Sequence, residues 1–175
     1  MAIWKRGALL LAAVLALAAL VLWEVVGGGE LQTDGEVAAT PLDRELLRQR
    51  EAGQAQVGSE AEGRILFGDL HVHSTLSVDA FQWSLPLVGG EGVHPPADAC
   101  DFARFCSQLD FYSLTDHAEA LTPRSWEMIR NSIRECNAVD SESEQPDLVA
   151  FTGFEWTQIG ATPETHFGHR NVIFK

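Results

Sequence analysis

Two histidines separated by one residue, His71 and His73, lie in the stretch GDLHVHSTLSVD. The surrounding pattern predicts a strand over residues 65–73, and side chains two positions apart on a strand point to the same face. Both imidazoles can therefore hold one cation. Asp69 shares that face and could orient a metal ligand by a hydrogen bond, while Asp79 lies in the loop that follows. An isolated pair of this kind is equally consistent with exposed histidines on an edge strand, so a metal site requires further ligands.

Each of the next three predicted strands carries a metal-ligand residue at or near one of its ends. These residues are His117 after the strand 111–115, Glu155 within the strand 148–156, and His169 at the start of the strand 169–174. His166, three residues before His169, is a weaker candidate. Ligand types that recur at successive strand ends gather at one mouth of a barrel. The sequence therefore predicts a metal site to which His71, His73, His117, Glu155 and His169 contribute, with Asp79 on the same side of the sheet.

Two predicted helices separate the first three strands and must position these residues. The first spans residues 97–109 and is expected to bury Phe102, Phe105, Cys106 and Leu109. The second opens at Thr122-Pro123 and carries an apolar stripe of Trp126, Ile129, Ile133 and Cys136. Strands that alternate with helices in this way predict an α/β fold with parallel pairing and right-handed crossovers.

Four segments, GDLHVHSTLSVDA, LDFYSLTDHAE, FTGFEWT and HFGHRNVIF, resemble the successive motifs of the polymerase-and-histidinol-phosphatase (PHP) superfamily of phosphoesterases. They resemble more closely a bacterial family of unknown function related to it, whose members often carry an N-terminal signal or anchor. The resemblance covers the chain from Arg64 onward. It implies a distorted (β/α)7 barrel with two or three divalent ions at the carboxyl ends of its strands.

The resemblance also implies a role for each candidate ligand. His71 and His73 would bind one ion, Glu155 would bridge it to a second ion completed by His169, and Asp79 and His117 would serve a third. Imidazole and carboxylate ligands suit zinc, manganese or iron. Later ligands of the superfamily are not found before Lys175. We therefore expect residues 64–175 to form the N-terminal part of the barrel, with an incomplete cluster and no activity of their own.

The reaction expected of the whole domain is hydrolysis. Clustered divalent ions supply a hydroxide near neutral pH, so no side-chain nucleophile is assigned, and a phosphate ester of unknown structure is the expected substrate. One alternative is a metallohydrolase of the amidohydrolase type, which also has a His-x-His after its first strand. That class often uses a bridging lysine, whereas the lysines here are Lys5 and Lys175. The other alternative is a non-catalytic, metal-stabilised envelope or binding module.

Residues 1–26 form a predicted signal anchor or signal peptide, because Lys5 and Arg6 precede an uncharged run from Ala8 to Trp23. An anchor would hold the ectodomain outside the cytoplasm, in the periplasm or the extracellular space, and a cleaved signal would release it. Residues 27–63, rich in Gly, Glu, Gln and Ala, are predicted to be a flexible spacer, apart from a short helix after Pro41.

Charge and cysteine content narrow the function further. The net charge of −13 excludes charge-driven binding of a nucleic-acid backbone, which requires a basic surface. The cysteines number three and contain no CxxC pair, so a thiolate zinc site is excluded. An odd count leaves at least one free thiol, and packing in the core is expected for Cys100, Cys106 and Cys136.

Overall fold

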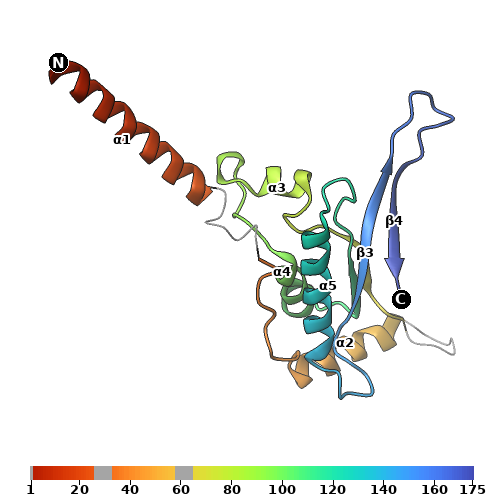
Figure 1. Ribbon diagram of the computed structural model, residues 1–175. Coiled ribbons are helices and arrows are strands. Elements are labelled where there is room, and N and C mark those ends of the chain that lie inside the picture. Colours follow the sequence, from red (N-terminus) through yellow and green to blue (C-terminus); the bar gives the residue numbers. More distant parts are fainter. Residues whose placement is uncertain (1, 26–32, 58–64) are drawn as a thin grey trace.

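The computed structural model describes residues 2–25, 33–57 and 65–175. The N-terminal helix α1 (Ala2–Val25) extends away from the rest of the chain (Figure 1). Its apolar side chains between Leu9 and Trp23 are exposed. Among the described residues, α1 is the one helix long and apolar enough to cross a membrane, through Arg6–Trp23. A signal sequence would have the same length and composition.

The other elements form a mixed α/β unit around one sheet. Its strands are β1 (Gly68–Val72), β2 (Phe111–Leu114), β3 (Val149–Gln158) and β4 (Gly168–Phe174), in the order β1-β2-β3-β4. The first two pairings are parallel, as predicted. The sheet curls like half a barrel, so that Asn171 Nδ2 on β4 donates to the carbonyl of Leu70 on β1 at 2.8 Å.

β4 departs from the alternation of strands and helices. It pairs antiparallel with β3 as a long hairpin, in which Thr152 lies opposite Phe174 and Gln158 opposite Gly168 (Figure 1). Only residues 159–167 connect the two strands. A parallel return needs a crossover of about a dozen residues or more, so this connection permits only a hairpin.

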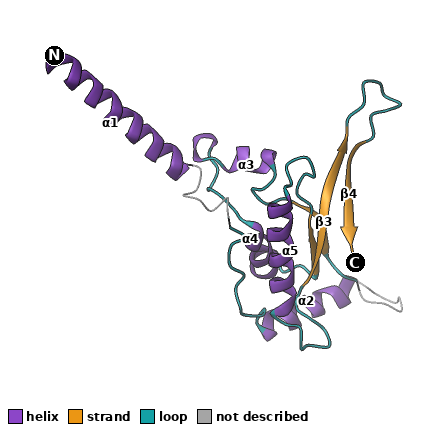
Figure 2. Ribbon diagram, in the orientation of Figure 1, coloured by secondary structure: helices purple, strands orange, loops and turns teal. Residues whose placement is uncertain are grey.

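Helices lie beside the sheet, and the helix of residues 123–138 packs on β3 (Figure 2). They are α2 (Arg44–Val57), α3 (Val78–Ser84), the 3-10 turn η2 (Pro86–Val88), α4 (Pro96–Asp101), the π-helical turn η3 (Phe102–Cys106) and α5 (Pro123–Ala138). α5 begins as predicted, with Thr122 capping the backbone N–H of Ser125 and Pro123 in the first turn. Its predicted stripe is confirmed, since Ile129, Ile133 and Cys136 are buried and Trp126 is half-buried.

The predicted burial along residues 97–109 is wrong for Phe102, Phe105 and Cys106, whereas Leu109 is half-buried against the core. Phe102 is 62% exposed, Phe105 and Cys106 are also exposed, and α4 gives way to η3 at Phe102. A π-helical turn holds an extra residue, which changes the face that later side chains present. The buried face carries instead a set of small residues and one arginine: Ala97, Cys100, Ala103 and Arg104.

The buried contacts of this face explain why Arg104 and the small residues are buried in place of the predicted aromatic side chains. Arg104 Nε donates to Asp147 Oδ2 at 2.9 Å, and its guanidinium also donates to the carbonyl of Cys136. Cys100 and Cys136 form a disulfide that joins α4 to α5, with their Cα atoms 6.0 Å apart. Two of the three cysteines are therefore in the core, but as a covalent bridge, and Cys106 is the free thiol.

Residues 33–57, which lie within the predicted spacer, pack against the domain. Val37 and Leu42 are buried, and the backbone N–H of Leu42 donates to Asp147 Oδ2 at 2.6 Å. On α2, Arg50 Nε lies 3.3 Å from Asp110 Oδ1. These polar anchors fix a segment whose apolar content alone is low.

Candidate metal centre

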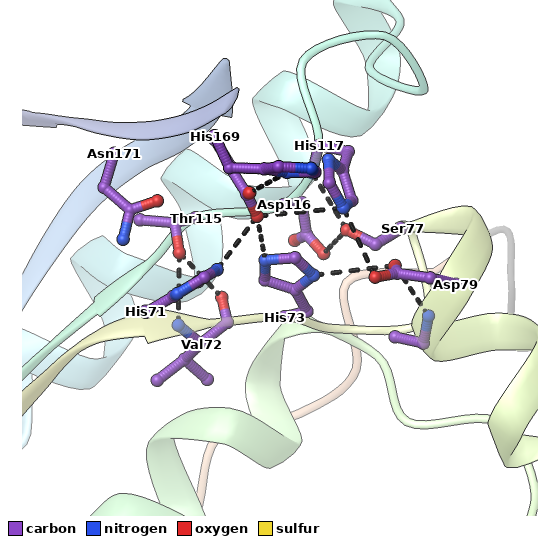
Figure 3. Close-up of polar contacts among 12 residues, drawn as sticks. His71, Val72, His73, Ser77, Asp79, Thr115, Asp116, His117, His169 and Asn171 are labelled. Carbon is purple, nitrogen blue, oxygen red and sulfur yellow. Dashed lines mark hydrogen bonds and ion pairs between the residues drawn. The ribbon is translucent and has the colours of Figure 1, made fainter. Parts of the chain in front are cut away.

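The six predicted ligands converge at one end of the sheet (Figure 3). His71 and His73 come from the end of β1, and His117 follows β2. Glu155 lies on β3, and His169 lies on β4 opposite Thr157, two residues along β3 from Glu155. Asp79 lies in the first turn of α3, next to His73. Every predicted ligand therefore reaches the same cluster.

Glu155 is the centre of this cluster. Its side chain is only 2% exposed, and its Oε2 lies 2.9 Å from His71 Nε2, 2.8 Å from His73 Nε2 and 3.7 Å from His117 Nε2. The second oxygen, Oε1, contacts His169 Nδ1. One buried carboxylate thus faces four imidazoles, none of which carries a permanent positive charge.

Asp79 extends the cluster toward solvent. Its Oδ2 lies 3.3 Å from His117 Nε2, and its Oδ1 lies 3.6 Å from His73 Nδ1. The ligand atoms form three overlapping groups, with the atoms of each group within 4.8 Å of one another. The groups are His71, His73 and Glu155; His73, Asp79 and His117; and His117, Glu155 and His169.

His73 provides the test of whether a cation fits here. Its buried Nε2 has no hydrogen-bond partner among the described residues, although Glu155 Oε2 is only 2.8 Å away. Buried polar atoms normally have a partner, and two ligand atoms at this separation but without hydrogen-bond geometry can instead point at a common ion. The donor set of histidines and carboxylates therefore fits a divalent metal.

The two carboxylates are also held in the form that binds metal. Burial would raise the pKa of Glu155, but the hydrogen bond from His71 and the proximity of His117 outweigh it, and the pKa is lowered. The pKa of Asp79 is lowered as well, because the backbone N–H of Ala80 and the neighbouring His117 outweigh its desolvation. Both groups stay ionised, as ligation requires.

Two residues outside the prediction lie next to the histidine rings. Thr157 Oγ1 lies 3.4 Å from His117 Nδ1 and 3.3 Å from His169 Nδ1. Glu119 Oε2 lies 3.7 Å from His117 Nδ1, and Glu119 Oε1 accepts from the backbone N–H of Thr157. Because His117 is held at Nδ1, its Nε2 stays directed at the cluster, whereas His169 faces both Thr157 and Glu155 with its Nδ1. Thr157 lies two residues after Glu155 on β3, so strand spacing could have identified it.

The remaining candidates lie outside the ligand set. Asp69 Oδ1 accepts from the backbone N–H of His71 at 2.9 Å, so it supports the chain of a ligand residue and not an imidazole ring. His166 is exposed and belongs to none of the ligand groups found among the described residues. His94 Nδ1 pairs with Asp98 Oδ2 at 3.0 Å.

A pocket of about 500 Å³ adjoins the β1 side of the cluster. Its lining includes His71, His73, Glu91, His94, Asp98 and Phe102. No lysine or arginine lines it among the described residues. The pocket offers room for a small molecule next to two of the candidate ligands.

Comparison with known proteins gives one match. A family model described as a protein of unknown function (DUF3604) matches residues 60–133, which include His71, His73, Asp79 and His117. The match supports the resemblance to a bacterial domain family of unknown function. No curated protein and no solved structure matches the chain.

Proposed function

We propose that this chain carries the site of a metal-dependent hydrolase, a phosphoesterase that uses metal-activated water. The observation that supports the proposal most directly is the buried carboxylate of Glu155 among four imidazoles, with the His73 Nε2 left without a hydrogen bond. A structural role alone does not require a carboxylate to be buried among side chains that carry no permanent positive charge.

Each ligand residue has a distinct place in the proposal. His71 and His73 hold one ion with Glu155, His117 and His169 share that carboxylate for a second, and Asp79 with His73 and His117 serves a third. Zinc, manganese or iron suits these ligands. Once bound, such ions polarise a substrate oxygen and lower the pKa of a water molecule. Thr157 and Glu119 keep the His117 ring oriented, and the adjoining pocket receives the organic part of the ester.

The wider setting of the proposal is a PHP-like barrel outside the cytoplasm. The curled sheet, with two parallel pairings and the ligands at one end, is consistent with part of a (β/α)7 barrel. The Cys100–Cys136 disulfide favours an oxidising compartment. α1 would deliver the domain there as a membrane anchor or as a cleaved signal.

The test compares the wild-type chain with the double variant His71→Ala/His73→Ala. The matched control is His166→Ala, which removes an exposed histidine that lies outside the ligand groups found among the described residues. Bound metal is measured by elemental mass spectrometry. Hydrolysis is measured with a phosphomonoester, a phosphodiester and an amide, each with and without added manganese or zinc.

We expect stoichiometric metal in the wild type and the control, and loss of metal in the ligand variant. Phosphoester hydrolysis is expected of the whole domain and should be lost with the same two histidines. A folded wild-type chain that binds no metal would refute the metal centre. Metal binding with amide hydrolysis by the whole domain would favour the amidohydrolase type, and metal binding without turnover of any substrate by the whole domain would favour a binding module.

A further inference from the structure

Asp116 is a fully buried carboxylate directly before the candidate ligand His117, and the proposed chemistry does not use it. It lies behind the cluster (Figure 3) and is absent from the ligand groups found among the described residues. Burying an acid is unfavourable unless hydrogen bonds satisfy it. Its partners therefore indicate what it does.

The hydrogen-bond partners of the Asp116 side chain all belong to the segment that connects β1 to α3. Asp116 Oδ1 accepts from the backbone N–H of Ser74 and from Ser77 Oγ, both at 2.8 Å. Asp116 Oδ2 accepts from Ser74 Oγ at 2.9 Å. This segment leads from His73 to Asp79, so one carboxylate fixes the chain between two candidate ligands.

Ser77 links this segment to the end of β2. Its hydroxyl donates to Asp116 and accepts from the backbone N–H of His117 at 2.9 Å. Ser77 is also the N-cap residue of α3, yet its side chain makes no capping hydrogen bond. A serine at this position normally caps the helix with its hydroxyl. The hydroxyl is directed instead to Asp116 and His117, so its role is to join the two segments.

The backbone of Asp116 is hydrogen-bonded to the backbone of Glu155, the residue that carries the central carboxylate. The carbonyl of Asp116 accepts from the backbone N–H of Glu155 at 3.0 Å. Asp116 is thus hydrogen-bonded to the chain on either side of the cluster: to the segment before Asp79 through its side chain, and to Glu155 through its main chain.

We propose that Asp116 is a positioning residue. Through the hydroxyl of Ser77 it holds Asp79 next to His117, and it thereby forms the part of the metal centre that those two ligands share. The inference rests on the proposed metal centre and adds to it a residue that touches neither ion nor substrate. Its role is geometric: two acceptor oxygens hold three donors of one segment at fixed places.

The geometric role makes a specific prediction for three variants. In Asp116→Asn, the amide oxygen still accepts from Ser74 N and Ser77 Oγ, and the amide nitrogen can donate to Ser74 Oγ. Asp116→Ala removes all of these partners, and Ser77→Ala removes the hydroxyl that joins Asp116 to His117 but keeps the two contacts with Ser74. The matched control is Ser132→Ala on α5, since Ser132 is also a fully buried serine but its hydroxyl has no partner among the described residues.

The experiment titrates the metal-free full-length chain with Mn²⁺ and follows bound ions by electron paramagnetic resonance, with thermal unfolding in chelator measured on the same samples. We expect Asp116→Ala and Ser77→Ala to weaken one class of bound ion by roughly 10- to 100-fold, as is typical for loss of a group that orients a ligand, while the other class keeps its affinity. Asp116→Asn and Ser132→Ala should stay within about 3-fold of the wild type, because the orienting contacts that set metal affinity remain.

Three results would overturn the inference. One is wild-type affinity for every ion in Ser77→Ala. This variant also tests the inference if Asp116→Ala does not fold. Another is an equal loss of all ions together with a lower unfolding temperature, which would make the network purely structural. The third is a loss in Asp116→Asn as large as in Asp116→Ala, which would make the negative charge, and not the geometry, the essential property. A wild-type chain that binds no Mn²⁺ would instead refute the metal centre on which the inference rests.

Discussion

The domain buries two carboxylates in two different ways. Asp147, between the helices and the sheet, is paired with the permanent cation of Arg104 and accepts the backbone N–H of Leu42. Glu155, at the end of the sheet, is surrounded by histidines. In the first arrangement the charges balance without a ligand, since a charge of each sign is present. The second gains its positive charge only from protons or a metal ion, which is what a binding site requires.

The same contrast extends to the surroundings of each group. The Asp147 region is tied by the Cys100–Cys136 disulfide and by the buried side chains of α5. In the cluster, His71 and His169 are more than half exposed while Glu155 between them is buried. A rigid, closed core therefore supports an open end of the sheet where solvent and small molecules have access to the ligands.

The largest effect is expected from breaking the core pair. Arg104→Met leaves the Asp147 carboxylate buried without its cation and should lower the free energy of unfolding by about 3–5 kcal/mol. Urea denaturation in the presence of chelator measures this change. The double variant Arg104→Met/Asp147→Leu should recover most of the loss, because it removes both charges. A single-variant loss below about 1 kcal/mol would show that the pair is not the stabilising centre that its burial indicates.

Glu155→Gln should give the opposite pattern, with a large loss of metal affinity and little change in stability. Removing the shared ligand should weaken metal binding by more than about 100-fold, since loss of groups that only orient ligands already reaches that value. In chelator, the free energy of unfolding should change by no more than about 1 kcal/mol, because the amide can keep a neutral hydrogen bond with the surrounding rings. Metal-binding titrations and urea denaturation together test this. Retained metal affinity, or a stability loss as large as that of Arg104→Met, would remove the distinction between the two carboxylates.

The residues of the cluster could be grouped from the sequence because their spacing follows from strand geometry. Histidines two residues apart share a strand face, and the ends of successive parallel strands meet, so the pattern of residues alone groups His71, His73, His117 and Glu155. The cap at Thr122 and the period of the α5 stripe are equally local signals. Local rules of this kind need no knowledge of tertiary contacts.

The core was harder to predict because its residues depend on distant partners. Arginine is rarely buried unless paired, and the partner of Arg104 is Asp147, which lies in a different segment. Neither the Cys100–Cys136 pairing nor the packing of residues 33–57 on Asp110 and Asp147 follows from local pattern. Asp116 and Ser77 were missed for the same reason: their role depends on hydrogen bonds between segments. The antiparallel β4, in contrast, could have been inferred from the short connection that precedes it.

The smallest effect is expected at the edge of the cluster, in Thr157→Val. The change keeps the β-branched shape on β3 but removes the hydroxyl that lies 3.4 Å from His117 Nδ1 and 3.3 Å from His169 Nδ1. Because two rings lose one orienting contact each and keep Glu155, metal affinity should fall by roughly 10-fold, at the low end for such groups. Unfolding in chelator should match the wild type and the control Thr152→Val, which lies on β3 outside the cluster. Unchanged metal affinity would mean that the rings are oriented by Glu155 alone. The open end of the sheet would then depend less on hydrogen bonds from neighbouring residues than the closed core does.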